Sequence, residues 1–108
     1  MFNINGETWI VLFVSPIHPS LRRSDGTFAW GVCNDLDKTI YIADHLSPED
    51  SKKVLCHEIT HSAMFSYNIY LDIEQEELLA NLMATFGEEI IDLTDILFFK
   101  LKEKWENR

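Results

Sequence analysis

The chain is short of basic residues, of cysteine and of long apolar runs, and each shortage argues against a class of protein. Nine lysines and arginines stand against eighteen aspartates and glutamates, and this formal net charge of −9 argues against a nucleic-acid backbone or an anionic membrane as partner. The two cysteines, Cys33 and Cys56, form neither a CxxC pair nor a disulfide framework, so we expect a protein of the reducing cytoplasm. The apolar run from Trp9 to Val14 is short and no basic residue precedes it, so we expect no signal peptide.

The length of the chain and its lack of internal boundaries predict one domain. It has 108 residues, of which 46% are hydrophobic, which is enough for one core of modest stability. The sequence contains no repeat, no low-complexity tract and no linker. We therefore expect residues 1–108 to form a single domain.

The first half of the chain shows the patterns of strands. Residues 8–14 are apolar on both faces, which is typical of a central strand covered by helices. Residues 28–33 and 38–43 read as two further strands, and the polar connection at residues 34–37 predicts a hairpin between them. Residues 15–27 carry two prolines and a glycine, and they indicate an irregular loop.

The second half shows the patterns of helices. A serine N-cap followed by Pro48 at the first helical position predicts a helix that runs to about Tyr67. Asp72 is expected to cap a second helix, which Gly87 closes, and a third helix follows to about Trp105. The predicted fold class is α+β, with a small antiparallel or mixed three-stranded sheet packed against the first helix and the two further helices.

The sequence H-E-I-T-H at residues 57–61 is the strongest functional signal. On a helix, His57 and His61 lie four residues apart on one face, so both imidazoles can bind one metal ion. Glu58 lies about 100° around the helix, away from the metal but close to a water molecule bound there. Two ligands, an open coordination position and a carboxylate that takes a proton from the attacking water are typical of a zinc metallopeptidase.

Another interpretation of this stretch needs no metal. Val54, His57, His61, Met64 and Phe65 follow helical spacing, so both histidines lie on the apolar stripe that should face the core. A single histidine in that position is more often a packed core residue. Two histidines at ligand spacing, with a glutamate between them, favour a metal site, and a metal-free core pair stays as the alternative.

A catalytic zinc site needs a third protein ligand. The motif that supplies it from a third histidine is excluded, because Met64 and Tyr67 occupy the corresponding positions. The second helix offers Glu74, Glu76 and Glu77 in its opening turns, and the short connection between the helices requires the second to double back against the first. One of these glutamates is therefore the expected third ligand.

The choice among the glutamates depends on their neighbours. Glu77 shares a helix face with Ala80 and Ala84, whose small side chains permit close approach to the first helix. Asn81, one turn after Glu77, is placed to hydrogen-bond a metal-bound imidazole. Glu76 lacks such a polar neighbour and is the alternative third ligand. A third interpretation is that these acids only complement the positive end of the helix dipole.

The block V-L-C-H-E-I-T-H, followed by E-E-L-L-A-N-L-M-A and preceded by a hairpin ending in T-I-Y-I, resembles the small gluzincin-type zinc metallopeptidases of phages and mobile elements. These include the ImmA/IrrE-like group and the minimal gluzincins, and the resemblance covers roughly residues 28–90. It implies a zincin-like fold in which one zinc ion is held by His57, His61 and Glu77, with Glu58 as general base. It also implies a phage or prophage origin and hence the cytoplasm of a bacterial host.

The resemblance also implies where a substrate binds. In that family the edge strand of the hairpin lies over the site and can pair with an extended peptide. In this chain the corresponding strand runs from Lys38 to Asp44, which would bind a protein or peptide substrate by strand addition.

Hydrolysis of a peptide bond usually needs a second group that stabilises the oxyanion. The candidates are His45, just after the strand that we expect at the edge, and Tyr67 or Tyr70 beyond the motif helix; each is more often a packing or surface residue. Arg22 and Arg23 could hold a substrate carboxylate, although a solvated pair of loop residues is the simpler explanation.

Three functions are compatible with this sequence. The first is a zinc metallopeptidase, and the second is a non-catalytic phage or prophage accessory protein with a structural zinc site. The third is a metal-free protein-interaction domain. Glu58 favours the first function over the second, because a structural site has no need of a free carboxylate beside the metal.

Overall fold

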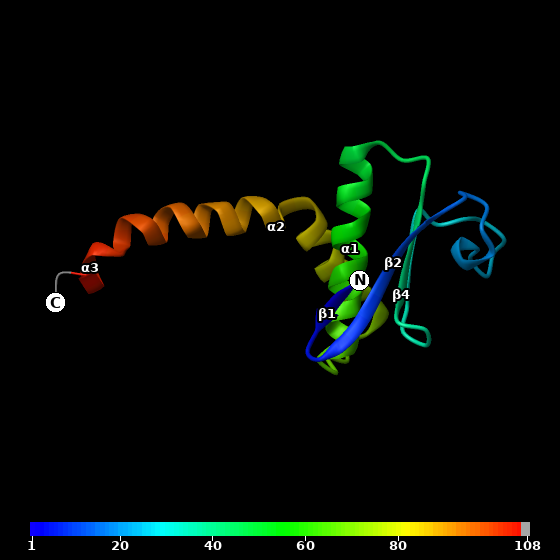
Figure 1. Ribbon diagram of the computed structural model, residues 1–108, viewed down its shortest axis with the longest axis horizontal. Coiled ribbons are helices and arrows are strands. Elements are labelled where there is room, and N and C mark those ends of the chain that lie inside the picture. The colour runs from blue at the N-terminus through cyan, green and yellow to red at the C-terminus, as the bar shows by residue number, and fades with distance from the viewer. Residues whose placement is uncertain (107–108) are drawn as a thin grey trace.

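The structure, a computed structural model, describes residues 1–106 as a four-stranded sheet, a helix packed against one of its faces and a long helix that extends well past it (Figure 1). The strands are β1 (Phe2–Ile4), β2 (Glu7–Val14), β3 (Gly31–Asn34) and β4 (Thr39–Ala43). The helices are α1 (Pro48–Ser66), α2 (Ile73–Leu101), the short α3 (Glu103–Glu106) and the 3-10 helix η1 (Pro19–Leu21). The predicted α+β class is confirmed.

The sheet has the order β1-β2-β4-β3, in which β2 and β4 are parallel and the two outer pairs are antiparallel. It is therefore mixed, as expected, but it has one strand more than we predicted. The additional strand, β1, is joined to β2 through Asn5 and Gly6, both of which have positive φ. Asn-Gly between two strands is a strong hairpin signal, so the sequence did contain evidence for this strand.

The prediction that the strand from Lys38 to Asp44 forms an edge of the sheet is wrong. β4 lies between β2 and β3, and Ile40 is paired with Val11 on one side and with Cys33 on the other. Its backbone groups are therefore already engaged, and no edge is left for a peptide. The physical reason is the burial of the apolar residues of β4. Ile40 is fully buried, and an inner position in the sheet shields such a residue from water better than an edge position does. The edge on this side is β3, while the predicted hairpin of β3 with β4 is confirmed.

The hydrophobic core lies between the sheet and α1. Trp9, Ile40 and Ile42 are fully buried on this face of the sheet, and Val54 and Ile59 of α1 pack against them. The motif helix is thus held on the sheet by apolar side chains from the same helix turns that carry the histidines.

The other face of the sheet is only partly covered. The loop that contains η1 lies on that side (Figure 1), and its Leu21 is fully buried. Ile10 and Leu12 of β2 remain 42% and 45% exposed. The expectation that helices cover both faces of residues 8–14 is therefore wrong, because α1 covers one face and a loop covers part of the other.

α1 has the predicted bounds to within one residue. The Ser47 side chain caps its N-terminus by accepting a hydrogen bond of 3.1 Å from a backbone N–H of the first turn, and Pro48 follows. At the other end, the indole N–H of Trp9 donates to Oγ of Ser66 at 2.8 Å, and the Asn5 amide donates to the Ser66 carbonyl at 2.9 Å. Both ends of the motif helix are therefore fixed by contacts that the sequence specifies.

α2 begins where predicted but ends much later. Asp72 caps it by accepting a hydrogen bond of 2.8 Å from the backbone N–H of Gln75. The predicted break at Gly87 is wrong, because the helix is continuous through that residue, so the two further helices are one long helix followed by α3. Gly87 lies buried inside the helix and does not have the positive φ of a helix-ending glycine. No helix within residues 1–106 is both long and apolar enough to cross a membrane.

Candidate metal centre

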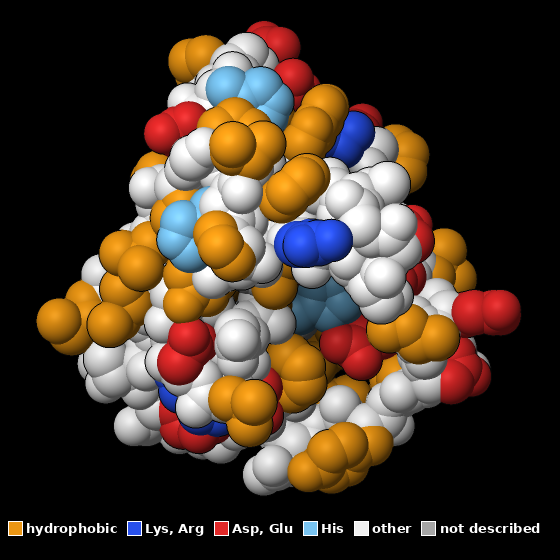
Figure 2. Space-filling view, turned by 90° about the vertical axis from the view of Figure 1, so that its right-hand side faces the viewer, with side chains coloured by type: hydrophobic (Ala, Val, Ile, Leu, Met, Phe, Trp, Pro, Cys, Tyr) orange, Lys and Arg blue, Asp and Glu red, His pale blue; other side chains and the backbone are white. Residues whose placement is uncertain are grey.

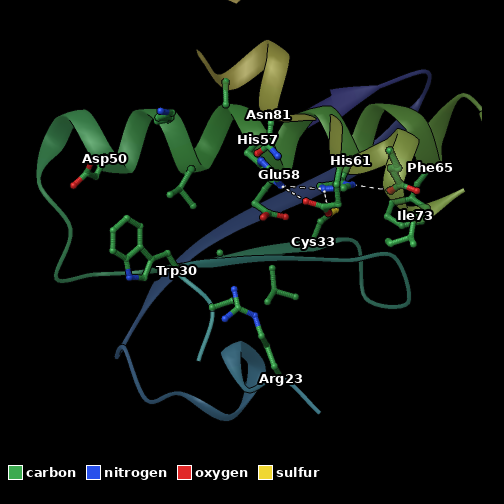
Figure 3. A pocket seen from close by; sticks show the side chains of 18 residues that line it. Arg23, Trp30, Cys33, Asp50, His57, Glu58, His61, Phe65, Ile73 and Asn81 are labelled. Atoms are coloured by element: carbon green, nitrogen blue, oxygen red, sulfur yellow. Dashed lines mark hydrogen bonds and ion pairs between the residues drawn. The ribbon is translucent and has the colours of Figure 1, made fainter. Parts of the chain in front are cut away.

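α1 presents the two motif histidines side by side. His57 and His61 lie about one helical turn apart, and their Nε2 atoms are separated by 3.2 Å. His61 is buried and His57 is half-buried, and both point into the same cavity (Figure 3). The helix therefore turns a local sequence pattern into two nitrogen atoms aimed at one point.

Glu77, in the first turns of α2, completes a group of three. One of its carboxylate oxygens lies 3.2 Å from Nε2 of His57, and the other lies 3.0 Å from Nε2 of His61. One ligand atom from each of the three residues lies within 4.8 Å of the others, so the group could hold a metal ion. Three bonds of about 2.1 Å at tetrahedral angles would place their ligand atoms roughly 3.4 Å apart, so this donor set fits a small tetrahedral ion.

Two features of the sequence bring Glu77 to the histidines. The short connection between the helices makes α2 run back along α1, so that the thiol of Cys56 lies 3.5 Å from the carbonyl oxygen of Met83. Ala80, less than one turn beyond Glu77, is fully buried, and its small side chain lets the two helices approach closely.

Glu76 occupies a different place around the same imidazole. Its carboxylate lies 2.7 Å from Nδ1 of His61, where it accepts the Nδ1 proton, and its side chain is 17% exposed. A proton held on Nδ1 leaves the lone pair of Nε2 free to bind a metal. The sequence left Glu76 and Glu77 as alternative third ligands, and the structure gives each of them a separate contact with His61.

Glu58 is buried beside this group, with 7% of its surface exposed. Burial raises the pKa of the Glu58 carboxyl to about 7; the nearby His61 lowers it, and the negative charge of Glu77 raises it further. A carboxyl group whose pKa lies near neutral pH can both accept a proton and return it. Glu58 is thus a buried carboxyl group beside the three possible ligands, and its role as general base stays a prediction.

Gly31 is a residue of the site that sequence reasoning missed. A Cβ atom at this position would lie 2.5 Å from Cγ1 of Val54 and 3.1 Å from Cγ of Glu58. The absence of a side chain therefore lets the edge strand β3 lie directly against the motif helix. A glycine inside a predicted strand often marks such a close approach, so the sequence did contain a signal.

The metal group opens into a cavity of about 710 Å³ between β3, α1 and the first turns of α2. Figure 2 shows histidine and acidic side chains recessed in a hollow of the surface. Trp30, Phe65 and Ile73 contribute apolar surface to the cavity wall, and Arg23 and Lys53 contribute positive charge (Figure 3). The cavity is wide enough for a peptide segment and is bounded on one side by an open strand edge.

The remaining candidates lie farther from the histidines. Asn81 lines the cavity, but within residues 1–106 it makes no hydrogen bond to either imidazole. His45 packs edge-on against the ring of Trp30, with the ring centres 6.4 Å apart, and it is not part of the cavity wall. Tyr67 and Tyr70 are exposed outside the cavity. Their roles in orienting a ligand or stabilising an oxyanion stay predictions.

Residues 11–102 match the model of a peptidase family that is described as the IrrE N-terminal-like domain. The matched segment begins within β2 and reaches the end of α2, so it contains all the residues of the metal group. No curated protein and no solved structure matches the chain.

Proposed function

Because the chain belongs to this peptidase family, the IrrE N-terminal-like domain, we propose that it is a zinc-dependent metallopeptidase in which Glu58 is the general base. The observation that carries this proposal is the convergence of His57, His61 and Glu77 on one point beside a buried carboxyl group. The proposed ligands are the two Nε2 atoms and a Glu77 oxygen. Two imidazoles and one carboxylate are a common catalytic zinc set that leaves the fourth position for water.

Glu76 is proposed to orient His61 rather than to bind the metal. The 2.7 Å contact between its carboxylate and Nδ1 of His61 is the arrangement in which a carboxylate fixes the tautomer and raises the basicity of a ligand imidazole. Such partners typically change metal affinity by about 10- to 100-fold. This assigns a different task to each of the two neighbouring glutamates.

The reaction that these residues support is hydrolysis of a peptide bond. Zinc in this site would supply Lewis acidity and a bound water with a pKa of about 7. Glu58 would accept the proton of the attacking water and deliver it to the leaving amine; burial raises its pKa in the metal-free protein, and a bound cation would lower it again and favour the basic form. Its burial keeps bulk water away from the carboxylate and so keeps the proton within the site.

The substrate is proposed to be a protein or peptide that lies along β3. β3 is the edge of the sheet on the cavity side, so its outward backbone groups can pair with an extended chain. The proposed binding strand is therefore β3 instead of β4, while the mode of binding, strand addition, is the one that the sequence suggested. The cavity wall carries both charges, since Arg23 and Lys53 line it together with Asp50 and the three glutamates of the site, so it offers partners for either charge of a bound peptide. We place this activity in one zincin-like domain of residues 1–108 in the cytoplasm.

The test begins with zinc content, measured by elemental analysis on the wild type, Glu77→Ala, Glu76→Ala and the control Glu74→Ala. We expect about one zinc per chain in the wild type and in Glu74→Ala. Glu77→Ala should lose it, and Glu76→Ala should bind it about 10- to 100-fold more weakly. Equal retention in Glu77→Ala would move the ligand elsewhere, and a wild type that takes up no zinc after reconstitution would exclude the proposal.

Glu58→Gln separates catalysis from metal binding. We expect this variant to bind zinc like the wild type and to lose turnover of peptide libraries. The decisive readout is the appearance of new amino termini, measured by mass spectrometry. A wild type that holds zinc and releases no new amino termini would identify the site as structural instead.

A further inference from the structure

The C-terminal part of α2 leaves the rest of the molecule (Figure 1). Among residues 1–106, the polar contacts between α2 and α1 end at the ion pair of Lys52 with Glu88, which measures 2.9 Å. Beyond that pair, residues 89–106 project away from the sheet, and the molecule is 60 Å long but only 30 and 28 Å across. We refer to residues 89–106 as the arm.

The arm exposes its large apolar side chains. Each of them is between 48% and 74% exposed, and they are Ile90, Ile91, Leu93, Ile96, Leu97, Phe98, Phe99, Leu101 and Trp105. A helix that stood alone in water would carry polar residues over most of this surface. An apolar surface of this kind marks an interaction site.

The apolar side chains are concentrated on one face of the helix. Phe86, Ile90, Leu93 and Leu97 are spaced alternately by four and three residues, which is the pattern of two packed helices, and Leu101 continues the stripe. The five side chains of the stripe are joined at its edge by Phe98 and Trp105. If these seven side chains offer roughly 80 Å² each, two copies would bury about 1,100 Å² in total, above the ~1,000 Å² expected of a specific interface. One helix face is therefore sufficient for a dimer.

The charges of residues 88–106 indicate how two copies would be oriented. Residues 88–95 contain four acids and no base, whereas residues 100–106 carry three lysines (Lys100, Lys102 and Lys104) against two acids (Glu103 and Glu106). In an antiparallel pair the lysines of one copy lie against the acids of the other. In a parallel pair, the acidic residues 88–95 of the two copies would face each other, which is unfavourable.

We propose that the arm binds the arm of a second copy of this chain, antiparallel, through the stripe from Phe86 to Leu101. The contact is isologous, so it closes as a dimer and does not extend into a filament. It leaves both metal centres outside the contact, since all their residues precede Phe86.

Sedimentation equilibrium of the zinc-loaded full chain tests the dimer. We expect a reversible monomer–dimer equilibrium, and Leu93→Ser with Leu97→Ser should raise its dissociation constant by at least about thirtyfold. Phe99→Ser is the matched control, because Phe99 is the most exposed apolar residue of the arm and points away from the stripe. Unchanged zinc content in all variants shows that the body has folded.

Salt and cysteine cross-linking test the orientation. Added salt should weaken an antiparallel dimer, since opposite charges face each other, and it would strengthen a parallel one. Thr94→Cys, beside the stripe and near the proposed two-fold axis, should form a covalent dimer with a short cysteine-reactive cross-linker. Lys104→Cys should not, and the parent chain, whose own cysteines are half-buried, is the control.

Three results would overturn the proposal. The first is a monomer at every concentration; small-angle scattering would then show whether the arm folds back on its own body. The second is equal weakening by Phe99→Ser and by the stripe variant, which would place the contact on another face. The third is efficient cross-linking of Lys104→Cys to itself, which would make the pair parallel. None of these readouts depends on peptidase activity.

Discussion

The two halves of α2 are both apolar, yet only the first half is packed against its own chain. Positions seven residues apart share a helix face, and Ala84, Ile91, Phe98 and Trp105 form such a series. The first of them is small, half-buried and part of the cavity wall, whereas the last three are large and exposed. All four residues are apolar, so hydrophobicity does not distinguish the two halves. What differs is the size of the side chains: the packed half has a small residue at this position, and the exposed half has large ones.

The same contrast between packed and unpacked apolar residues extends beyond α2, to Trp9 in β2 and Trp105 in α3, and these two residues give the strongest test of it. Trp9 is fully buried and hydrogen-bonded to Ser66, while Trp105 is 48% exposed. Trp9→Ala should lower the free energy of unfolding by about 3–5 kcal/mol, because it leaves a cavity and an unpaired hydroxyl. Trp105→Ala should change it by less than about 0.5 kcal/mol. The free energies are measured by urea unfolding of dilute protein, followed by circular dichroism. Similar losses of stability in both variants would contradict the distinction between a packed body and an unpacked arm.

Zinc should stabilise the packed half alone. At a free zinc concentration about 100 times the dissociation constant, the free energy of unfolding should rise by about 2.7 kcal/mol, and a chelator should reverse the gain. Hydrogen exchange should show the added protection in α1 and in the first turns of α2, near Glu77. Added protection spread evenly to Leu101 would mean that the two halves respond as one unit.

Ala80→Leu tests how tightly the first half is packed. Ala80 is fully buried where α2 meets α1, so a larger side chain should cost about 1–3 kcal/mol. It should also weaken zinc binding, since Glu76 and Glu77 lie within about one turn of it. Thr94→Leu adds similar volume at an exposed position of the second half and should change stability by no more than about 0.5 kcal/mol. The experiment compares thermal unfolding of the two variants.

Gly87→Ala should have the smallest effect and the opposite sign. Gly87 lies inside the helix where the two halves meet, and an added Cβ would lie 3.0 Å from the flexible end of Met83. Removing the conformational freedom of glycine should therefore raise stability by about 0.5–1 kcal/mol. Hydrogen exchange should report slower opening of the amides beyond residue 87. A loss of stability instead would show that α1 leaves no room for a methyl group there.

The metal centre was predictable because most of its geometry is local. What the structure shows is the grouping of three residues that could hold a metal ion: the period of one helix brings His57 and His61 together, and a short turn and the period of the next helix bring Glu77 to them. The division of labour between Glu76 and Glu77 was not predictable, because the two residues differ by one step around α2 and only the crossing of the helices decides which contacts which nitrogen.

The errors in the fold concern contacts between distant parts of the chain. The strand order that puts β4 in the centre depends on its parallel pairing with β2, and no local pattern encodes that choice. Gly87 resembled a helix end, but the helix continues because the apolar period on both sides of it is unbroken and outweighs the cost of one glycine. Strand order and helix continuity depend on contacts between distant segments, so the pattern of one segment does not predict them.

The parallel pairing of β2 with β4 also has a consequence for the order of folding. The turn at residues 5–6, the turn at residues 35–38 and the connection between α1 and α2 all close short loops, which form within microseconds. Pairing Val11 with Ile40 must instead close the whole intervening segment, and its loop entropy makes this the slow step. The helical hairpin that carries His57, His61 and Glu77 can therefore assemble before the sheet, so the proposed metal ligands come together while the sheet is still forming.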